Sequence, residues 1–572
     1  MRAMSHQALS ARYRASILAL MAIAALSPGC GPAAPPAAPA PATPASSTSA
    51  STAAVPADDP RFGRHHHAIR TTNAEAQRAF DRGFDFVFGF NHEEAAKAFA
   101  KAAELDPSTA MPLWGVAWAI GPNYNLDIDD ARSKQAYDAM QKAVALAKNG
   151  PPEERAYVEA MAIRFSPDPK ADRVALARQY SDRMRAVMQQ FPDDLDAATL
   201  YAESLMNLKA WKLWTLDGKP ADRTEEIVRV LEGVLARDPN HLGANHYYIH
   251  TVEASPTPAR ALASADRLRT LAPMAGHLVH MPAHILARTG DHEGAAKANL
   301  AGAEADRAFL AGKPDDNFYG MAYYTHNLHF LADSEMMQGR YAEATRAAAD
   351  LTARLAPHTA MMPMGESMVA MRYSVPLRFA KHDDALAMPA PPADHPVELA
   401  WYHFARGVSL ARTGKVDDAA AARTAMQTAA AAIPDSALFG GTGLESATTI
   451  LALAGVVLDA RIAWARGAKP EAVALWRKAV ALADAVPYDE PPIWFYPVRE
   501  SLGAALLLSG DAAGAERVFR EDLVRFPRNP RSLFGLHESL VAQKKTADAV
   551  WVKQAFDAAW ARAAGPLTLE ML

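Results

Sequence analysis

Cysteine is almost absent from this chain of 572 residues, because Cys30 is the only one. A single cysteine excludes an intrachain disulfide. Long basic runs are missing too, and the net charge is only -5, so the charge pattern gives no indication of nucleic-acid binding. The chain also lacks a phosphate-binding glycine loop, a nucleophile elbow, a Cys-His arrangement and the His-Glu-x-x-His signature of zinc proteases. No catalytic residue can be assigned from these motifs.

Hydrophobic residues, in contrast, make up 50% of the chain, so it can bury a large core. At the N-terminus an apolar stretch over residues 15–26 follows three arginines; it is too short to span a bilayer and is typical of a signal peptide. It ends at Leu26-Ser27-Pro28-Gly29-Cys30, which resembles a bacterial lipoprotein processing site. The resemblance implies that residues 1–30 are a signal peptide, that Cys30 is lipidated, and that the membrane is a partner through this lipid.

Residues 31–58 consist almost entirely of Ala, Pro, Ser and Thr, a composition that predicts a disordered tether. Such a tether would hold the globular part away from a membrane surface. We therefore expect a protein of the bacterial cell envelope, lipid-anchored on the periplasmic or outer face, or secreted if Cys30 is not lipidated.

An internal repeat runs through residues 73–565. One copy contains small, aromatic and proline positions in a fixed order: Gly83, Phe86, Ala95, Phe99, Ala102 and Pro107. Further copies follow the same order, including Gly503, Leu506, Ala515, Phe519 and Pro527, and then Gly535, Ala547 and Trp551. The small residues let two antiparallel helices approach closely, the large residues fill the space between repeats, and the proline ends the second helix.

This pattern resembles the tetratricopeptide repeat (TPR) family. The resemblance implies an all-α fold over residues 59–572, a right-handed α-solenoid of about eight or nine degenerate helical hairpins with insertions. Three phrases, at residues 90–94, 280–284 and 496–506, also resemble a group of uncharacterised exported bacterial TPR lipoproteins. That second resemblance implies fold and export, and it carries no activity.

Some stretches break the repeat period and indicate loops or insertions: residues 121–136, 205–224, 310–320 and 384–396. Trp211 lies in the second of them and packs between repeats or forms the wall of a pocket. The run His65-His66-His67 follows the tether. It fits a solvated run, a loose metal site or a flap over the groove.

Nine histidines lie between residues 241 and 330, and seven of them fall on only three short segments. Within each segment the spacing is three, four or seven residues, which places the side chains on one face of a helix. In the repeat frame these segments are the first helices of consecutive hairpins, and in the TPR family the positions concerned face the concave groove. We therefore predict a histidine-lined groove at residues 241–330.

Histidine is the commonest metal ligand, and an imidazole-rich set with few carboxylates suits zinc, copper, iron or nickel. The candidate ligands are His246, His250, Glu253, His277, His280, His284, His326 and His329. With more than four candidates, a two-metal centre fits, and it could be catalytic. Residues that could support the ligands or line the groove are Tyr247, Tyr248, Tyr323, Asn327, Arg499 and Glu500; for the last two, a structural ion pair is the alternative.

Recognition of a small anion in the groove, or no specific role, stays open for these histidines. The alternative function is a cell-envelope scaffold that binds a peptide or protein partner in the groove. Whether the protein is an enzyme stays open, and so does the identity of the metal.

Overall fold

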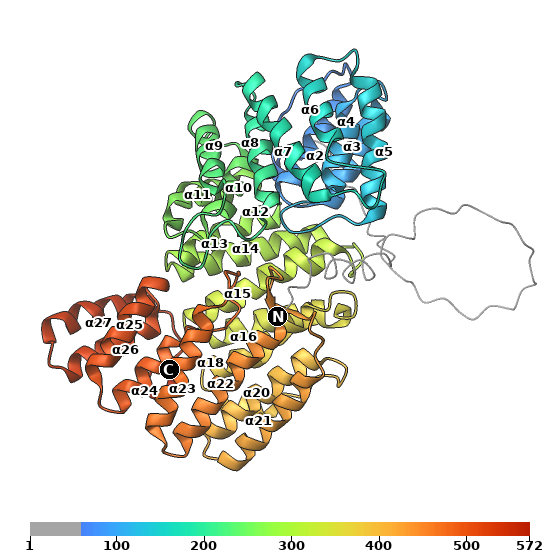
Figure 1. Ribbon diagram of the computed structural model, residues 1–572. Helices are drawn as coiled ribbons and strands as arrows, with labels where there is room; N and C mark the ends of the chain where they lie inside the picture. The colour runs from blue at the N-terminus through green and yellow to red at the C-terminus, as the bar shows by residue number, and fades with distance from the viewer. Residues whose placement is uncertain (1–58) are drawn as a thin grey trace, which may run out of the picture.

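The structure, a computed structural model, describes residues 59–572 as an array of helices that follow one another in antiparallel hairpins (Figure 1). The predicted all-α solenoid is confirmed. The predicted signal peptide, the tether and the lipidation site at Cys30 lie outside the described residues.

The first part of the array carries the candidate histidines. It contains α2 (Ala74–Phe88), α3 (His92–Leu105), α4 (Met111–Ile120), α5 (Asp130–Ala147), α6 (Pro152–Ala162), α7 (Arg173–Gln190), α8 (Leu195–Leu208), α9 (Thr224–Arg237), α10 (Leu242–Val252), α11 (Leu262–Leu271), α12 (Gly276–His280), α13 (Pro282–Arg288), α14 (His292–Leu310), the π-helical turn η3 (Gly320–Tyr324) and α15 (Thr325–Met337). The short 3-10 turns in this part are η1 (Pro60–Phe62) and η2 (Pro258–Ala261).

The second part continues the same alternation. It contains α16 (Tyr341–Leu355), η4 (Ala356–His358), α17 (Gly365–Val369), α18 (Met371–Arg378), α19 (His382–Ala387), α20 (Pro396–Arg412), α21 (Val416–Ala431), α22 (Ala447–Ala465), α23 (Lys469–Asp484), α24 (Arg499–Leu508), α25 (Ala512–Arg525), α26 (Pro530–Ala542), α27 (Thr546–Trp560) and η5 (Leu569–Met571). One small antiparallel hairpin joins β1 (Leu438–Phe439) to β2 (Glu445–Ser446).

The first hairpin shows how the sequence sets the helices. The Asn73 side chain accepts a hydrogen bond from the backbone of Glu75 at 2.9 Å and so starts α2, and Asn91 caps α3 in the same way. Phe80, Phe84 and Phe88 are buried at a spacing of four residues along α2. This apolar stripe packs α2 into the core.

Glycine allows the close helix approach that the repeat pattern predicts. A Cβ atom added at Gly83 would lie 2.3 Å from the Phe99 ring, and one added at Gly503 would lie 2.5 Å from the Phe519 ring. Both contacts join a small residue of a first helix to a large residue of the second helix. They confirm the packing that was inferred from the repeat.

The first five hairpins wind so tightly that α10 reaches back to α2. His246 Nδ1 lies 2.6 Å from the Phe88 carbonyl oxygen, although the two residues are 158 positions apart. Aromatic rings fill the inside of the turn; for example, the Phe88 ring lies 5.8 Å from the rings of both Trp118 and Tyr247. The predicted groove is therefore closed in this part of the solenoid, and its first helices line a buried interior.

Three segments differ from their predicted limits, one of them because α19 runs to Ala387 inside the stretch predicted at 384–396. α5 begins at Asp130, so the loop predicted over residues 121–136 ends earlier, and α8 continues to Leu208 inside the stretch predicted at 205–224. Among the described residues, α22 is the one helix long and apolar enough to cross a membrane. Because 67% of its apolar window is buried, α22 fits equally well as a core helix.

Candidate metal centre

The three histidine segments become α10, the broken helix α12–α13, and α15. Their side chains converge as two triplets, the first formed by His246, His250 and His277 and the second by His280, His284 and His326. Within each triplet the candidate ligand atoms all lie within 4.8 Å of one another. The triplets adjoin, since the His250 and His284 ring centroids are 5.4 Å apart.

Four of these imidazoles are oriented by a hydrogen bond from Nδ1 to an oxygen acceptor. His246 Nδ1 faces the Phe88 carbonyl oxygen at 2.6 Å, and His280 Nδ1 faces Asn299 Oδ1 at 2.7 Å. Glu253 serves two rings, since His250 Nδ1 lies 2.9 Å from Oε1 and His284 Nδ1 lies 2.5 Å from Oε2. A ring that donates its Nδ1 proton to such an acceptor keeps its Nε2 lone pair free, which is the arrangement of metal-ligating histidine.

Nε2 atoms within each triplet face one another. The Nε2 atoms of His246 and His277 are 3.1 Å apart, and those of His280 and His284 are 2.7 Å apart. His250 Nε2 is buried without a hydrogen-bond partner. Where both Nε2 atoms of a pair carry lone pairs, such contacts are repulsive unless a proton or a metal ion lies between the rings.

The pKa is lowered for five of the six histidines in the triplets and raised for one. Burial lowers the pKa of His250 to about 3, against the attraction of Glu490, so this ring is neutral at neutral pH. Burial also lowers the pKa of His326 to about 3. His284 differs, because Glu490 and Glu253 outweigh the effect of burial and raise its pKa to about 10.

A pair of buried carboxylates lies beside His284. Glu253 is 1% exposed and Glu490 is 4% exposed, and both bond to His284 Nδ1. Tyr488 donates a hydrogen bond to Glu490 at 3.0 Å. Burial and the neighbouring Glu253 raise the pKa of Glu490. Two adjacent buried carboxylates favour additional positive charge nearby, which bound metal ions would supply.

Aromatic side chains from irregular segments wall the first triplet. The Phe90 ring is 4.4 Å from that of His246, and Phe90 adopts a left-handed backbone with a φ of 56° between α2 and α3. Tyr124 and Trp211, from two of the predicted insertions, lie 5.5 and 5.6 Å from the His250 ring. Tyr323, from the π-helical turn, lies 4.9 Å from the His277 ring. Irregular segments therefore converge on the histidines, as loops around functional sites do.

Of the other residues that the sequence assigned to the site, some lie beside the histidines and others do not. Tyr247 packs beside His246, with ring centroids 5.5 Å apart, while the Tyr248 hydroxyl bonds to Glu232 on α9. Asn327 donates to Asp306 at 2.6 Å, and Asp306 also accepts from Tyr319. The Tyr319 hydroxyl in turn accepts from the His277 backbone N–H, so Asn327 belongs to a network that supports α12.

His329, Arg499 and Glu500 lie outside both triplets. His329 lines a separate small cavity with residues that include Met371 and Trp401. Arg499 forms a bidentate pair with Asp484, and Glu500 pairs with the buried Arg378. For Arg499 and Glu500 the structural ion pair, which was the alternative prediction, describes what is seen.

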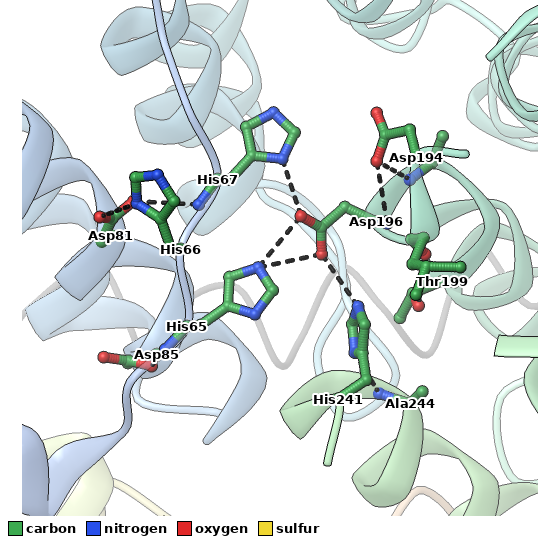
Figure 2. A network of polar contacts seen from close by, with 12 residues as sticks. His65, His66, His67, Asp81, Asp85, Asp194, Asp196, Thr199, His241 and Ala244 are labelled. Atoms are coloured by element: carbon green, nitrogen blue, oxygen red, sulfur yellow. Dashed lines mark hydrogen bonds and ion pairs between the residues drawn. The ribbon is translucent and has the colours of Figure 1, made fainter. Parts of the chain in front are cut away.

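A second histidine cluster lies at the N-terminal edge of the described residues (Figure 2). The carboxylate of Asp196, on α8, bonds to His65 Nε2 at 3.0 Å, to His67 Nδ1 at 2.7 Å and to His241 Nε2 at 3.1 Å. His66 points away and pairs with Asp81. The cluster fastens residues 63–72 across α2, α8 and the start of α10.

Hydrogen-bond direction distinguishes this cluster from the two triplets. His241 Nδ1 accepts from the Ala244 backbone N–H at 3.2 Å, so the proton of the neutral ring is on Nε2, where it donates to Asp196. That nitrogen has no lone pair for a metal ion. The pKa of Asp196 lies well below its usual value because His65, His241 and His67 outweigh the effect of burial. Residues 63–72 are therefore held by an imidazole–carboxylate clasp, formed by His65, His67, His241 and Asp196.

Comparisons with known proteins give no assignment of the site. No family model matches the chain, and no curated protein matches it. Similar solved structures include the human IFIT1 dimer with m7Gppp-AAAA, at 10% identity and a TM-score of 0.31, covering 86% of this chain and 91% of that one. Yeast Tom70 matches at 12% identity and a TM-score of 0.31, covering 84% and 98%. The APC/C hetero-tetramer Cut9-Hcn1 matches at 12% identity and a TM-score of 0.28, covering 86% and 95%.

Proposed function

We propose that the protein binds two transition-metal ions, one at each histidine triplet, inside the closed part of the solenoid. The observation that carries this proposal is the direction of the imidazoles. His246, His250 and His280 present Nδ1 to oxygen acceptors, so their Nε2 lone pairs turn toward the centre of each triplet. His284 Nε2, whose proton a metal ion would displace, faces His280 Nε2.

The ligand atoms of the triplets limit which metal ion can bind. The triplets offer imidazole nitrogen alone, which suits zinc, copper or iron and disfavours calcium and magnesium. Glu253 would act mainly through the rings, since its two carboxylate oxygens bond to His250 and His284. It would thus fix the orientation and raise the basicity of both ligands.

Elemental analysis of the full chain, extracted with detergent and freed of loose metal, tests the proposal. Two equivalents of a transition metal per chain are expected. His277→Ala and His326→Ala should each remove one equivalent, whereas His403→Ala, on α20 outside both triplets, should remove none. A metal content near zero, or one that His277→Ala and His326→Ala leave unchanged, would overturn the proposal.

A peptide- or protein-binding scaffold is the second candidate, because a helical-repeat solenoid offers a large surface. The closed interior around the triplets does not serve this role, since aromatic side chains such as Phe90, Tyr124 and Trp211 fill it. A partner retained in a pull-down by the metal-free His277→Ala/His326→Ala double variant would support the scaffold function independently of metal.

We further propose that lipid on Cys30 anchors the protein in the cell envelope. The motif at residues 26–30 supports this localisation. Mass analysis of the mature N-terminal peptide checks it, and Cys30→Ala should move the protein from the membrane fraction to the soluble fraction. An unmodified N-terminus at Met1 would contradict export.

A further inference from the structure

Residues 567–572 follow α27 and fold back onto the second part of the solenoid. The preceding residues 564–566 are irregular and exposed, and the segment then forms a short extended stretch and the turn η5. η5 packs on α24, and Figure 1 marks the end of the segment there. Hydrogen bonds join the segment to α20, α22, α24 and α26, the first helices of four consecutive hairpins. The segment therefore lies along the groove that these helices form.

One side chain from each of the four helices donates to a backbone carbonyl oxygen of the segment. The donors, in helix order, are Arg412, Arg461, Ser501 and Arg531. Arg461 and Ser501 both donate to the Leu572 oxygen, at 2.7 and 3.2 Å. Arg531 donates to the Met571 oxygen at 3.0 Å. Because every peptide carries carbonyl oxygens, these contacts favour an extended chain without requiring this particular sequence.

The side chains of the segment engage the groove only in part. Leu567 and Leu572 are 7% and 3% exposed and act as apolar anchors, whereas Thr568 and Glu570 are exposed. A small cavity lies beside Leu572, lined by apolar side chains of α20 and α22 that include Phe404. Since the segment fills the groove incompletely and has two anchors, a peptide with better-matched side chains would displace it.

The groove also carries positive charge that the segment does not balance. Among residues 59–572, Arg412, Arg461 and Arg531 form no ion pair with an Asp or Glu side chain, and carbonyl oxygens accept their hydrogen bonds. Burial and the neighbouring Arg461 lower the pKa of Arg412 to about 10, against the attraction of Glu570 in the segment. Buried or half-buried positive charge without a counter-charge favours an anionic ligand.

We infer that this groove binds an extended acidic peptide with apolar anchors, and that residues 567–572 occupy it as an attached competitor. Acidic side chains of the peptide would pair with the three arginines, and its carbonyl oxygens would replace those of the segment. Because residues 561–566 form a short linker from α27, the segment stays at a high effective concentration and lowers the apparent affinity of the site. The site is separate from the histidine triplets. The inference rests on the scaffold function, the second candidate, and gives it a surface and a class of partner.

Fluorescence anisotropy of a labelled peptide, titrated with the full chain, tests the inference. The peptide copies residues 566–572 with Thr568→Glu, which adds a carboxylate at an exposed position. In the protein, Leu567→Ser/Leu572→Ser removes both anchors of the attached segment and should raise the affinity for the peptide about 10-fold. A peptide without Thr568→Glu should bind less tightly, and high salt should reduce that difference.

Arg461→Ala, added to the double-serine variant, tests the groove itself. It should lower the affinity for the peptide about 10-fold, because it removes a charge-assisted hydrogen bond. The matched control is Arg466→Ala, which alters an exposed arginine directly after α22 and should leave the affinity unchanged. In the unaltered protein, an excess of the free peptide should speed hydrogen exchange of the attached segment, a readout that depends on no variant.

The outcomes separate this inference from the proposed functions. A double-serine variant that binds no peptide, or binding that Arg461→Ala leaves unchanged, would overturn the inference. Exchange of the attached segment that stays the same in excess peptide would also overturn it. A pull-down partner that Arg461→Ala still retains would overturn it too, while leaving the scaffold function standing at another surface. Metal content is measured independently of all these results.

Discussion

Replacement of Asp196 by Asn should release residues 63–72 from the solenoid while the helices stay folded. Three imidazole rings bond to this one carboxylate, which is 6% exposed. Asparagine keeps the shape and one acceptor oxygen, but its amide group turns N–H bonds toward rings that are themselves donors. The variant thus removes the charge and leaves at least one buried donor without an acceptor.

The size of the effect follows from this geometry. Breaking a buried ion pair by altering one partner costs about 3–5 kcal/mol. We take about 3 kcal/mol for the clasp, because Asn can still accept one hydrogen bond. If opening of the segment is local, its backbone amides should exchange with solvent about 100-fold faster, since each 1.4 kcal/mol is a factor of ten.

Hydrogen exchange read by mass spectrometry is the suitable assay, because it reports on the segment without requiring global two-state unfolding. Peptides from residues 63–72 should lose protection, and peptides from α20–α27 should not change. His66→Ala provides the control, because the His66 ring is 64% exposed and pairs only with Asp81 at the surface. Equal protection of residues 63–72 in Asp196→Asn and in the unaltered protein would refute the clasp.

Four further results are expected. Protection of the segment should depend on pH, which exchange at a series of pH values checks; a flat profile would contradict this. The pKa of His67 is raised by Asp196 against the effect of burial, so the stabilisation by His67 is complete below pH 6.5 and is lost as the pH rises through the folded-state pKa. The pKa of Asp196 is lowered, so the stabilisation by its carboxylate is lost as the pH falls below 3.8. Metal binding at the second triplet should release one proton, because the metal displaces the proton that His284 holds with a pKa of about 10. The metal affinity should therefore rise about tenfold for each unit by which the pH rises, up to pH 10. Calorimetry in buffers of different ionisation enthalpy would detect the proton, and binding without proton release would refute the prediction. Glu490→Gln should weaken metal affinity about 10- to 100-fold by removing a charge that orients His284, as chelator competition would show, and unchanged affinity would mean that Glu490 plays no part. Trp211→Ala should speed metal removal by a chelator and leave affinity nearly unchanged, because the ring covers His250 without bonding to it; an unchanged rate would show that metal leaves by another route.

Helix-face reasoning predicted which of these residues meet. The spacing of His246 with His250, and of His280 with His284, put each pair on one side of a helix, and the repeat frame placed α10 and α12 next to each other. The same reasoning explains one misplacement. Tyr248 lies two residues from His246 and so points toward α9, because residues two apart do not share a helix face.

Contacts between distant segments could not be predicted from one sequence. Glu490 is 206 residues from His284, in a loop that no repeat period constrains, and its only local signal was a carboxylate within a proline-rich aromatic stretch. Asp196 looked like an ordinary residue in the first turn of a helix, and its meeting with His65 and His67 depends on how the solenoid closes. Burial of the histidine triplets also depends on how the solenoid closes, because α10 returns to α2.

Anomalous diffraction from crystals of the metal-loaded full chain would locate the two proposed metal ions. Two peaks are expected at the metal absorption edge, one among His246, His250 and His277 and one among His280, His284 and His326. No peak is expected between Asp196 and His241, because the hydrogen bonds of His241 leave no lone pair on Nε2. A map without peaks at the triplets, or with its strongest peak at Asp196, would contradict a metal ion in each triplet.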